Sequence, residues 1–355
     1  MNRRHLSSSA RPVVIAMLCL AAVAVAAQGT APVAAPRGSG ASTPAPPRMP
    51  DGHPDLQGTW NYGTLTPLER PAELAGKATL SDEDVARAEA ESKELATEKV
   101  KERKTNLTRK FDTTARPGDV GFYNQSWFEQ GNTVLATRQT SLIVDPPDGR
   151  LPLMTPQGQQ RLAGIRAGKK RNAGPEDRPP RERCITGFND GPPMLPAAYS
   201  NLVGILQAPG YVTIHNEMVH TVRVVPMDGR PHGTTRQWVG DPRGRWEGDT
   251  LVVDSINFRN EGIGADEVVG SADENLHLVE RFRRLDEDTL LYEATVDDPT
   301  VWTRPWTVSF TLQKSDERIF EYACHEGNYA MEGILGGARE DERKAADATS
   351  GRRKK

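Results

Sequence analysis

The sequence predicts a mainly β protein with a helical N-terminal part. Short apolar segments with strand-like alternation follow one another after Cys184, and tight-turn sequences such as residues 227–230 and 247–249 separate them. Before Cys184, two segments carry helix start signals. Consecutive short strands joined by tight turns favour an antiparallel meander. Closure into a lipocalin-like up-and-down barrel would remove its exposed edges, and a β-sandwich is the alternative.

Residues 1–27 predict a signal peptide, because a basic start is followed by a short apolar run that ends in small residues of the Ala-x-Ala type. Residues 28–50 are rich in Ala, Pro, Gly and Ser, which predicts a disordered leader. We therefore expect a periplasmic or secreted protein. No later segment is long and apolar enough to predict a stable membrane span after signal cleavage.

The rest of the chain predicts one β-rich domain over residues 51–335, followed by a charged tail over residues 336–355. Its first part, residues 51–183, contains the helical and hairpin elements, and residues 184–335 form the expected barrel. Order is expected to begin near residues 51–56 and the strand-like residues 58–62.

Two helices and a hairpin are expected in the first part. Ser81, followed by three acidic residues, predicts the start of an exposed helix that extends to about Arg103. Thr155 and Pro156 predict the start of a shorter helix that extends to about Ala167. Residues 142–154 resemble a hairpin around the turn at 146–149.

Eight strands are expected in the second part. They cover residues 202–207, 211–225, 235–239, 250–256, 276–284, 289–296, 307–314 and 319–324.

Cys184 and Cys324 are the two cysteines that remain after signal cleavage. Export permits a disulfide, and an even number of cysteines makes it the expected state. Closing so long a loop stabilises the fold by roughly 4 kcal/mol in the chain-entropy model. Two unpaired buried thiols are the alternative.

Composition and motifs exclude several classes of function. The net charge of -3, with 26% charged residues, gives no electrostatic signature for binding nucleic acid. Residues 215–220 do not match the His-Glu-x-x-His zinc motif, because the glutamate stands at the third position and the segment is strand-like. His232 lies in a turn sequence and is expected on the surface.

Strand alternation places three ionisable residues among apolar neighbours. Glu280 shares the parity of Leu278 and Phe282, His220 has the apolar parity of residues 211–225, and Glu326 that of residues 320–324. We therefore expect His220, Glu280 and Glu326 to converge in one cavity. A one-residue bulge in any of these strands would reverse the assignment.

Three hypotheses follow for these residues. They could form an acid/base catalytic site, or a metal site to which His215, His277 or His325 contributes a further ligand. They could instead form a structural network in which arginines neutralise the carboxylates. The candidate ligand-binding residues around them are Glu217, Arg223, His277, Arg281, His325 and Trp306. The sequence names neither a metal nor any other cofactor.

Several motifs resemble a large family of exported β-rich proteins from soil bacteria. They comprise residues 51–58, 217–232, 244–253, 280–282 and 324–329. The resemblance covers nearly all of the mature chain and implies export and a single β-rich domain. It implies no activity and no catalytic residues.

These observations lead to two functional hypotheses. The first is an exported enzyme that acts on a small organic molecule in a barrel cavity by acid/base chemistry, with or without a metal. The second is a non-catalytic periplasmic protein that binds a small molecule in the same cavity.

Overall fold

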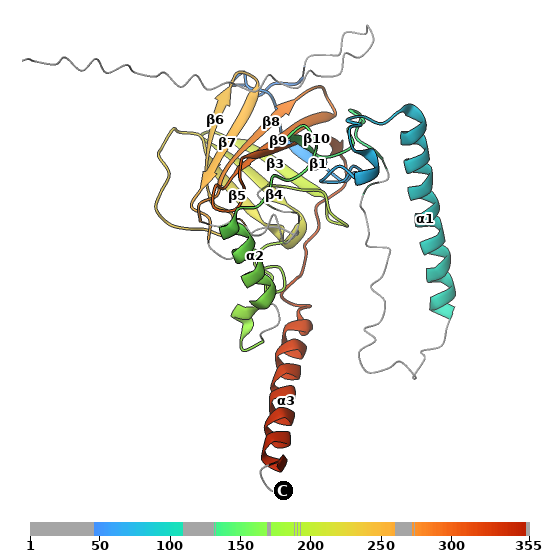
Figure 1. The fold of residues 1–355 in the computed structure, drawn as a ribbon. Helices are drawn as coiled ribbons and strands as arrows, with labels where there is room; N and C mark the ends of the chain where they lie inside the picture. Colours follow the sequence, from blue (N-terminus) through green and yellow to red (C-terminus); the bar gives the residue numbers. More distant parts are fainter. Residues whose placement is uncertain are drawn as a thin grey trace, which may run out of the picture. The chain divides into compact units, whose positions relative to one another are not determined.

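The computed structural model describes residues 46–108, 131, 133–168, 172–187, 189, 191, 193–259, 272 and 274–352. The expected signal peptide and most of the expected leader lie outside these residues. The strands are β1 (Gly58–Asn61), β2 (Ile143–Asp145), β3 (Leu202–Ala208), β4 (Tyr211–Asn216), β5 (Val222–Pro226), β6 (Asp241–Glu247), β7 (Thr250–Ile256), β8 (His277–Arg284), β9 (Thr289–Asp297) and β10 (Trp306–Ser315). The helices are α1 (Asp82–Thr108), α2 (Pro156–Gly168) and α3 (Tyr329–Arg352) (Figure 1). No helix in this part of the chain could cross a membrane.

One antiparallel sheet contains the strands of the described residues. Its order is β5-β4-β3-β1-β10-β9-β8-β7-β6, and β2 pairs with β10 beside this path. The expected antiparallel meander is therefore confirmed. Two meanders, β3-β4-β5 and β6-β7-β8-β9-β10, are joined by the N-terminal strand β1, which pairs with both β3 and β10.

The sheet curls but its hydrogen-bonded path does not close. A Cβ on Gly244 of edge strand β6 would lie 2.8 Å from Val225 Cγ1 of the other edge strand, β5, and 2.2 Å from Met227 Sδ. The two edges therefore approach each other through side chains, while the strand pairing ends at β5 and β6. The structure thus contains the expected antiparallel sheet in an open form.

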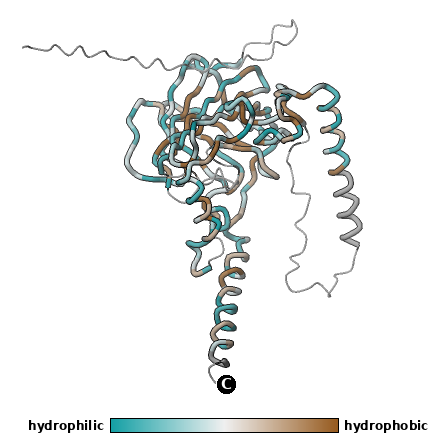
Figure 2. The backbone as a smooth tube through the Cα atoms, viewed as in Figure 1, coloured by the Kyte–Doolittle hydropathy of each residue, from teal (hydrophilic) through white to brown (hydrophobic). Residues whose placement is uncertain are grey.

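Alternation along the strands builds the core. Every second residue of β8 and β9 is buried, so that one face of each strand faces the interior. Aromatic residues fill much of this space, and Tyr292 lies between Phe282 and Phe310 with ring centroids 5.1 Å from each. Figure 2 shows hydrophobic residues concentrated in the strands and alternating with hydrophilic ones.

The expected helices form where their start signals lie. The Asp84 amide donates to Ser81 Oγ at 3.2 Å, and the Gly158 amide donates to Thr155 Oγ1 at 3.0 Å, so both hydroxyls cap the first turn of a helix. Residues 336–352 of the expected charged tail are helical and belong to α3. Its Glu–Arg pairs at helical spacing, including Arg343 with Glu340, stabilise such a helix.

Four strand predictions are wrong. Residues 319–324 form no strand, and residues 235–239 contribute one isolated bridge, between Gln237 and Phe258. A turn with positive φ at Val219 and His220 divides residues 211–225 into β4 and β5. Residues 142–154 do not form a hairpin, because β2 pairs with β10.

The motif at residues 51–58 packs on the motif at residues 244–253. The His53 ring stacks on Trp246 with centroids 4.6 Å apart, and Arg48 makes a two-bonded ion pair with Asp249 at 2.9 Å. The side chain of Arg284 bonds the Asp55 carbonyl. These motifs therefore attach the N-terminal segment to the β6–β7 hairpin.

Candidate functional site

The three residues expected to converge occupy different environments. Glu280 is fully buried on the inner face of β8. His220 is exposed in the turn between β4 and β5, and Glu326 is exposed in a turn that follows Cys324. The inward placement of His220 and Glu326 was wrong because both lie outside strands, where a period of two has no meaning.

His215, one of the three histidines considered as a further metal ligand, is half-buried on β4. Burial, followed by the charge of His220, lowers the pKa of its imidazole. Within the described residues, no group of three or more His, Cys, Asp or Glu side chains has an arrangement that could hold a metal ion.

Glu280 belongs to a buried network of three side chains. Both of its oxygens accept hydrogen bonds from the guanidinium of Arg223 on β5, one of them at 3.0 Å. The Tyr292 hydroxyl donates to Glu280 Oε1 at 2.8 Å and accepts from the Met194 amide at 3.0 Å. Burial, reinforced by the charge of Glu280, raises the pKa of Tyr292 well above its usual range. The geometry thus gives Glu280 the structural role that was one of the three hypotheses.

The candidate ligand-binding residues also lie in different parts of the structure. Arg223 and Trp306 are buried in the core. Arg281 pairs with Glu247 at 2.7 Å on partly exposed side chains, and His325 is exposed. His277 bonds Asp254, as described below. Of these six candidates, Glu217 is the one that lines the large groove described below.

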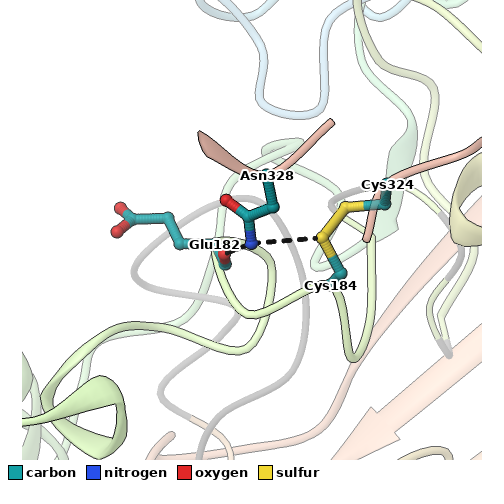
Figure 3. The surroundings of a disulfide bond; sticks show 4 residues. All are labelled: Glu182, Cys184, Cys324 and Asn328. Atoms are coloured by element: carbon teal, nitrogen blue, oxygen red, sulfur yellow. Dashed lines mark hydrogen bonds between the residues drawn. A yellow bond between two sulfur atoms is a disulfide. The ribbon is translucent and has the colours of Figure 1, made fainter. Parts of the chain in front are cut away.

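The predicted disulfide between Cys184 and Cys324 is present, across 140 residues of sequence. Asn328 stands beside it and donates from Nδ2 to the Glu182 carbonyl at 2.8 Å and to Cys184 Sγ at 3.5 Å (Figure 3). The bridge and this amide fix the segment that leads into α3 against the segment before β3.

A groove of about 1200 Å³ lies next to the disulfide. One wall comes from residues 181–200 and the end of β4, and the other from residues 320–334. Its lining is Arg181, Glu182, Cys184, Tyr199, Ser200, Glu217, Phe320, Glu321, Tyr322, Ala323, Cys324, Gly327, Asn328, Ala330, Met331 and Ile334. Apolar and aromatic side chains thus alternate with a few charged ones, a composition typical of small-molecule sites.

The sequence did not predict this groove, although it predicted the disulfide that brings the two walls of the groove together. A disulfide brings two Cα atoms within about 7 Å, so the neighbours of Cys184 and Cys324 had to lie together. The sequence predicts a strand over residues 319–324 and no helix over residues 329–335, and it therefore gives Phe320, Met331 and Ile334 no common surface.

A second polar cluster lies on the outer face of the sheet. Asp254 of β7 accepts from His232 Nε2 at 3.0 Å and from His277 Nε2 at 3.1 Å. His232 is therefore partly buried and bonded, instead of lying exposed in a turn as expected. Asp254 lies on the outer face of β7. The alternation of apolar and polar residues therefore gave no reason to select it as a candidate site residue.

No family model and no curated protein matches this chain. Among solved structures, the chain is similar to a "secretary abundant heat soluble (SAHS) protein" from Ramazzottius varieornatus, with 12% sequence identity and a TM-score of 0.20. The match covers 32% of this chain and 70% of that one. A match with so low a TM-score gives no basis for assigning a function to this chain.

Proposed function

We propose that this protein is an exported binding protein for a small organic molecule and that it holds its ligand in the groove beside the disulfide. The observation that carries the proposal is the groove itself. It is large enough for a small organic ligand, and its lining combines three aromatic rings, aliphatic side chains and a few charged groups.

The arrangement of the ionisable residues supports binding more than catalysis. An acid/base site needs a carboxylate that can reach the substrate and exchange a proton. Glu280 is buried and bonded through both oxygens, while His220 and Glu326 are exposed at separate turns. None of these three residues lines the groove, so we propose that the ligand is bound there without being chemically changed.

Export is the second part of the proposal. It is supported by the signal-like residues 1–27, by the resemblance to exported proteins of soil bacteria, and by the disulfide, which is a bond favoured outside the cytosol. We interpret the curled sheet as a lipocalin-like barrel that is open between β5 and β6, and it serves as the rigid support for the groove.

The fluorescent dye 1-anilinonaphthalene-8-sulfonate, which has an aromatic body and one sulfonate group, tests the groove directly. We expect the folded protein to bind it, and the Phe320→Ala variant to bind it about tenfold more weakly, a loss of about 1.4 kcal/mol in binding free energy. Phe320 is 71% exposed, so its truncation should leave the melting temperature unchanged.

Leu153→Ala is the matched control, because Leu153 is also a highly exposed apolar residue and lies outside the groove. It should bind the dye as the wild type does. Absence of dye binding by the folded protein, or equal affinities of the two variants, would contradict the proposal. Independently of the dye, native mass spectrometry of protein recovered from an exporting host would identify any ligand that co-purifies.

A further inference from the structure

The disulfide is part of the surface of the groove, and its two cysteines differ in exposure. Cys184 and Cys324 both line the groove. Cys184 is buried, with 4% of its surface exposed, whereas Cys324 is partly exposed. A small molecule that enters the groove therefore has better access to the Cys324 end of the bond than to the Cys184 end.

Asn328 places a hydrogen-bond donor at the Cys184 end. Its Nδ2 donates to Cys184 Sγ at 3.5 Å and to the Glu182 carbonyl at 2.8 Å (Figure 3). A thiolate carries a full negative charge and accepts a stronger hydrogen bond than a disulfide sulfur does. If the bond breaks, this amide therefore stabilises the sulfur of Cys184 as a thiolate.

The charges near the two cysteines favour the same direction of cleavage. Cys184 directly follows residues 181–183, which are two arginines and one glutamate. The glutamate is itself paired with a further arginine. Cys324, in contrast, lies between Glu321 and Glu326. Because cations stabilise a thiolate and anions destabilise it, Cys184 is the better leaving group of the two.

Cys184 also has an unusual backbone conformation. Its φ is 55°, in the left-handed region that residues with a Cβ rarely adopt. Such a conformation persists where the surrounding structure imposes it. The bond to Cys324 is one of the constraints on this residue, and cleavage of the bond removes that constraint.

We propose that the groove side of this disulfide is a site of thiol–disulfide exchange with a dithiol. One thiolate of the dithiol attacks Cys324 Sγ, the bond between the two cysteines breaks, and Cys184 leaves as a thiolate that takes up a proton. The second thiol of the dithiol then displaces Cys324 from the mixed disulfide. Two electrons and two protons thus pass to the protein, and the dithiol becomes a disulfide.

Exchange converts a covalent attachment between the two walls of the groove into a non-covalent one. Asn328 still bonds the Glu182 carbonyl, and Arg339 of α3 donates to the carbonyls of Asn172 and Ala173 at 2.7 and 2.9 Å. These contacts keep the two thiols near each other, so that the bond can form again. The exchange chemistry is independent of the proposed function, whereas an effect on ligand binding rests on it.

Trapping of the mixed disulfide tests the direction of attack. The mature protein, which lacks Cys19 of the expected signal peptide, is treated while folded with 2-mercaptoethanol. Acid stops the exchange, the released thiol is alkylated, and peptide mass spectrometry locates both groups. We expect the mixed disulfide on Cys324 in about tenfold excess over Cys184, because access and leaving group both favour it.

The same reaction in urea-denatured protein is the reference, and there the excess should largely disappear because access no longer differs. A folded protein that does not react would overturn the proposal. So would an even distribution of the mixed disulfide in the folded protein, or an equal excess in the folded and denatured proteins.

Asn328→Asp tests the leaving group. The variant keeps the shape of the side chain, loses the donor and places a negative charge beside Cys184 Sγ, so the excess on Cys324 should fall about tenfold. Asn257→Asp is the matched control, because Asn257 Nδ2 also donates to a backbone carbonyl but does not line the groove. An excess in Asn328→Asp as large as in the wild type would contradict the role of the amide.

Binding of 1-anilinonaphthalene-8-sulfonate separates this proposal from the proposed function. Reduction with dithiothreitol should lower the affinity for the dye about tenfold, and reoxidation should restore it. Equal affinities of the oxidised and reduced forms would overturn the effect of exchange on the groove and leave ligand binding intact. Failure of the oxidised protein to bind the dye would contradict the proposed function, and the trapping experiment would still decide the exchange.

Discussion

Glu280 illustrates how a single buried carboxylate can be structural. A desolvated charge costs several kcal/mol unless it is paired and hydrogen-bonded. Arg223 supplies the opposite charge and two bonds, and Tyr292 supplies a third. Because Arg223 lies on edge strand β5 and Glu280 on β8, the pair connects two distant strands of the sheet across its interior.

Replacing Glu280 should therefore destabilise the fold. In Glu280→Gln the charge of Arg223 remains buried without its counter-ion, and we expect the free energy of unfolding in urea to fall by roughly 3 kcal/mol. The double variant Arg223→Met/Glu280→Gln removes both charges and should recover most of this loss. A Glu280→Gln variant as stable as the wild type would contradict the structural role of the pair.

At the scale of elements, the contact between the edge strands depends on a glycine. Gly244 of β6 faces Val225 and Met227, and any side chain there would meet both. This close approach brings β5 and β6 together without the hydrogen bonds of a strand pair. It also explains why a glycine interrupts an otherwise regular strand.

Gly244→Ala should disturb that contact. The added methyl group would lie 2.8 Å from the stiff Val225 side chain, and such overpacking costs about 1–3 kcal/mol of unfolding free energy. Gly164→Ala, in α2, is the control, because a Cβ there meets nothing within 4 Å and alanine favours helix. Thermal unfolding should show a lower melting temperature for Gly244→Ala alone. An unchanged value would mean that the two edges separate easily.

On the scale of the whole molecule, the disulfide encloses most of the sheet. Cys184 and Cys324 are separated by 140 positions in the sequence, and the segment between them contains β3 to β10. The same bond forms one end of the groove. Overall stability and the proposed binding surface therefore depend on one covalent link.

Removing the link should affect both properties. We expect the double variant Cys184→Ser/Cys324→Ser to lose about 4 kcal/mol of unfolding free energy, because the unfolded chain regains its freedom. Dye binding in the groove should fall with it, while the far-ultraviolet circular dichroism of the sheet is retained at low temperature. Thiol titration of the denatured mature protein, from which the expected signal peptide with Cys19 has been removed, should find no free thiol before reduction, and two free thiols would contradict the bridge.

Local signals in the sequence determined much of the secondary structure. Hydroxyl caps located the starts of α1 and α2, turn sequences separated most strands, and alternation placed Glu280 on the inner face. Each of these properties depends on residues within a few positions of one another. Redox chemistry and an even cysteine count likewise sufficed for the disulfide.

Only the tertiary structure decided how these pieces meet. β1 pairs with β3 and β10, Arg223 reaches Glu280, and His232 reaches Asp254, all between segments far apart in the chain. Such pairings depend on packing and on which edges are left open, and many alternatives share the same local pattern. The groove could not be predicted from the sequence for this reason. Its two walls come from distant segments, and only the folded chain places them side by side.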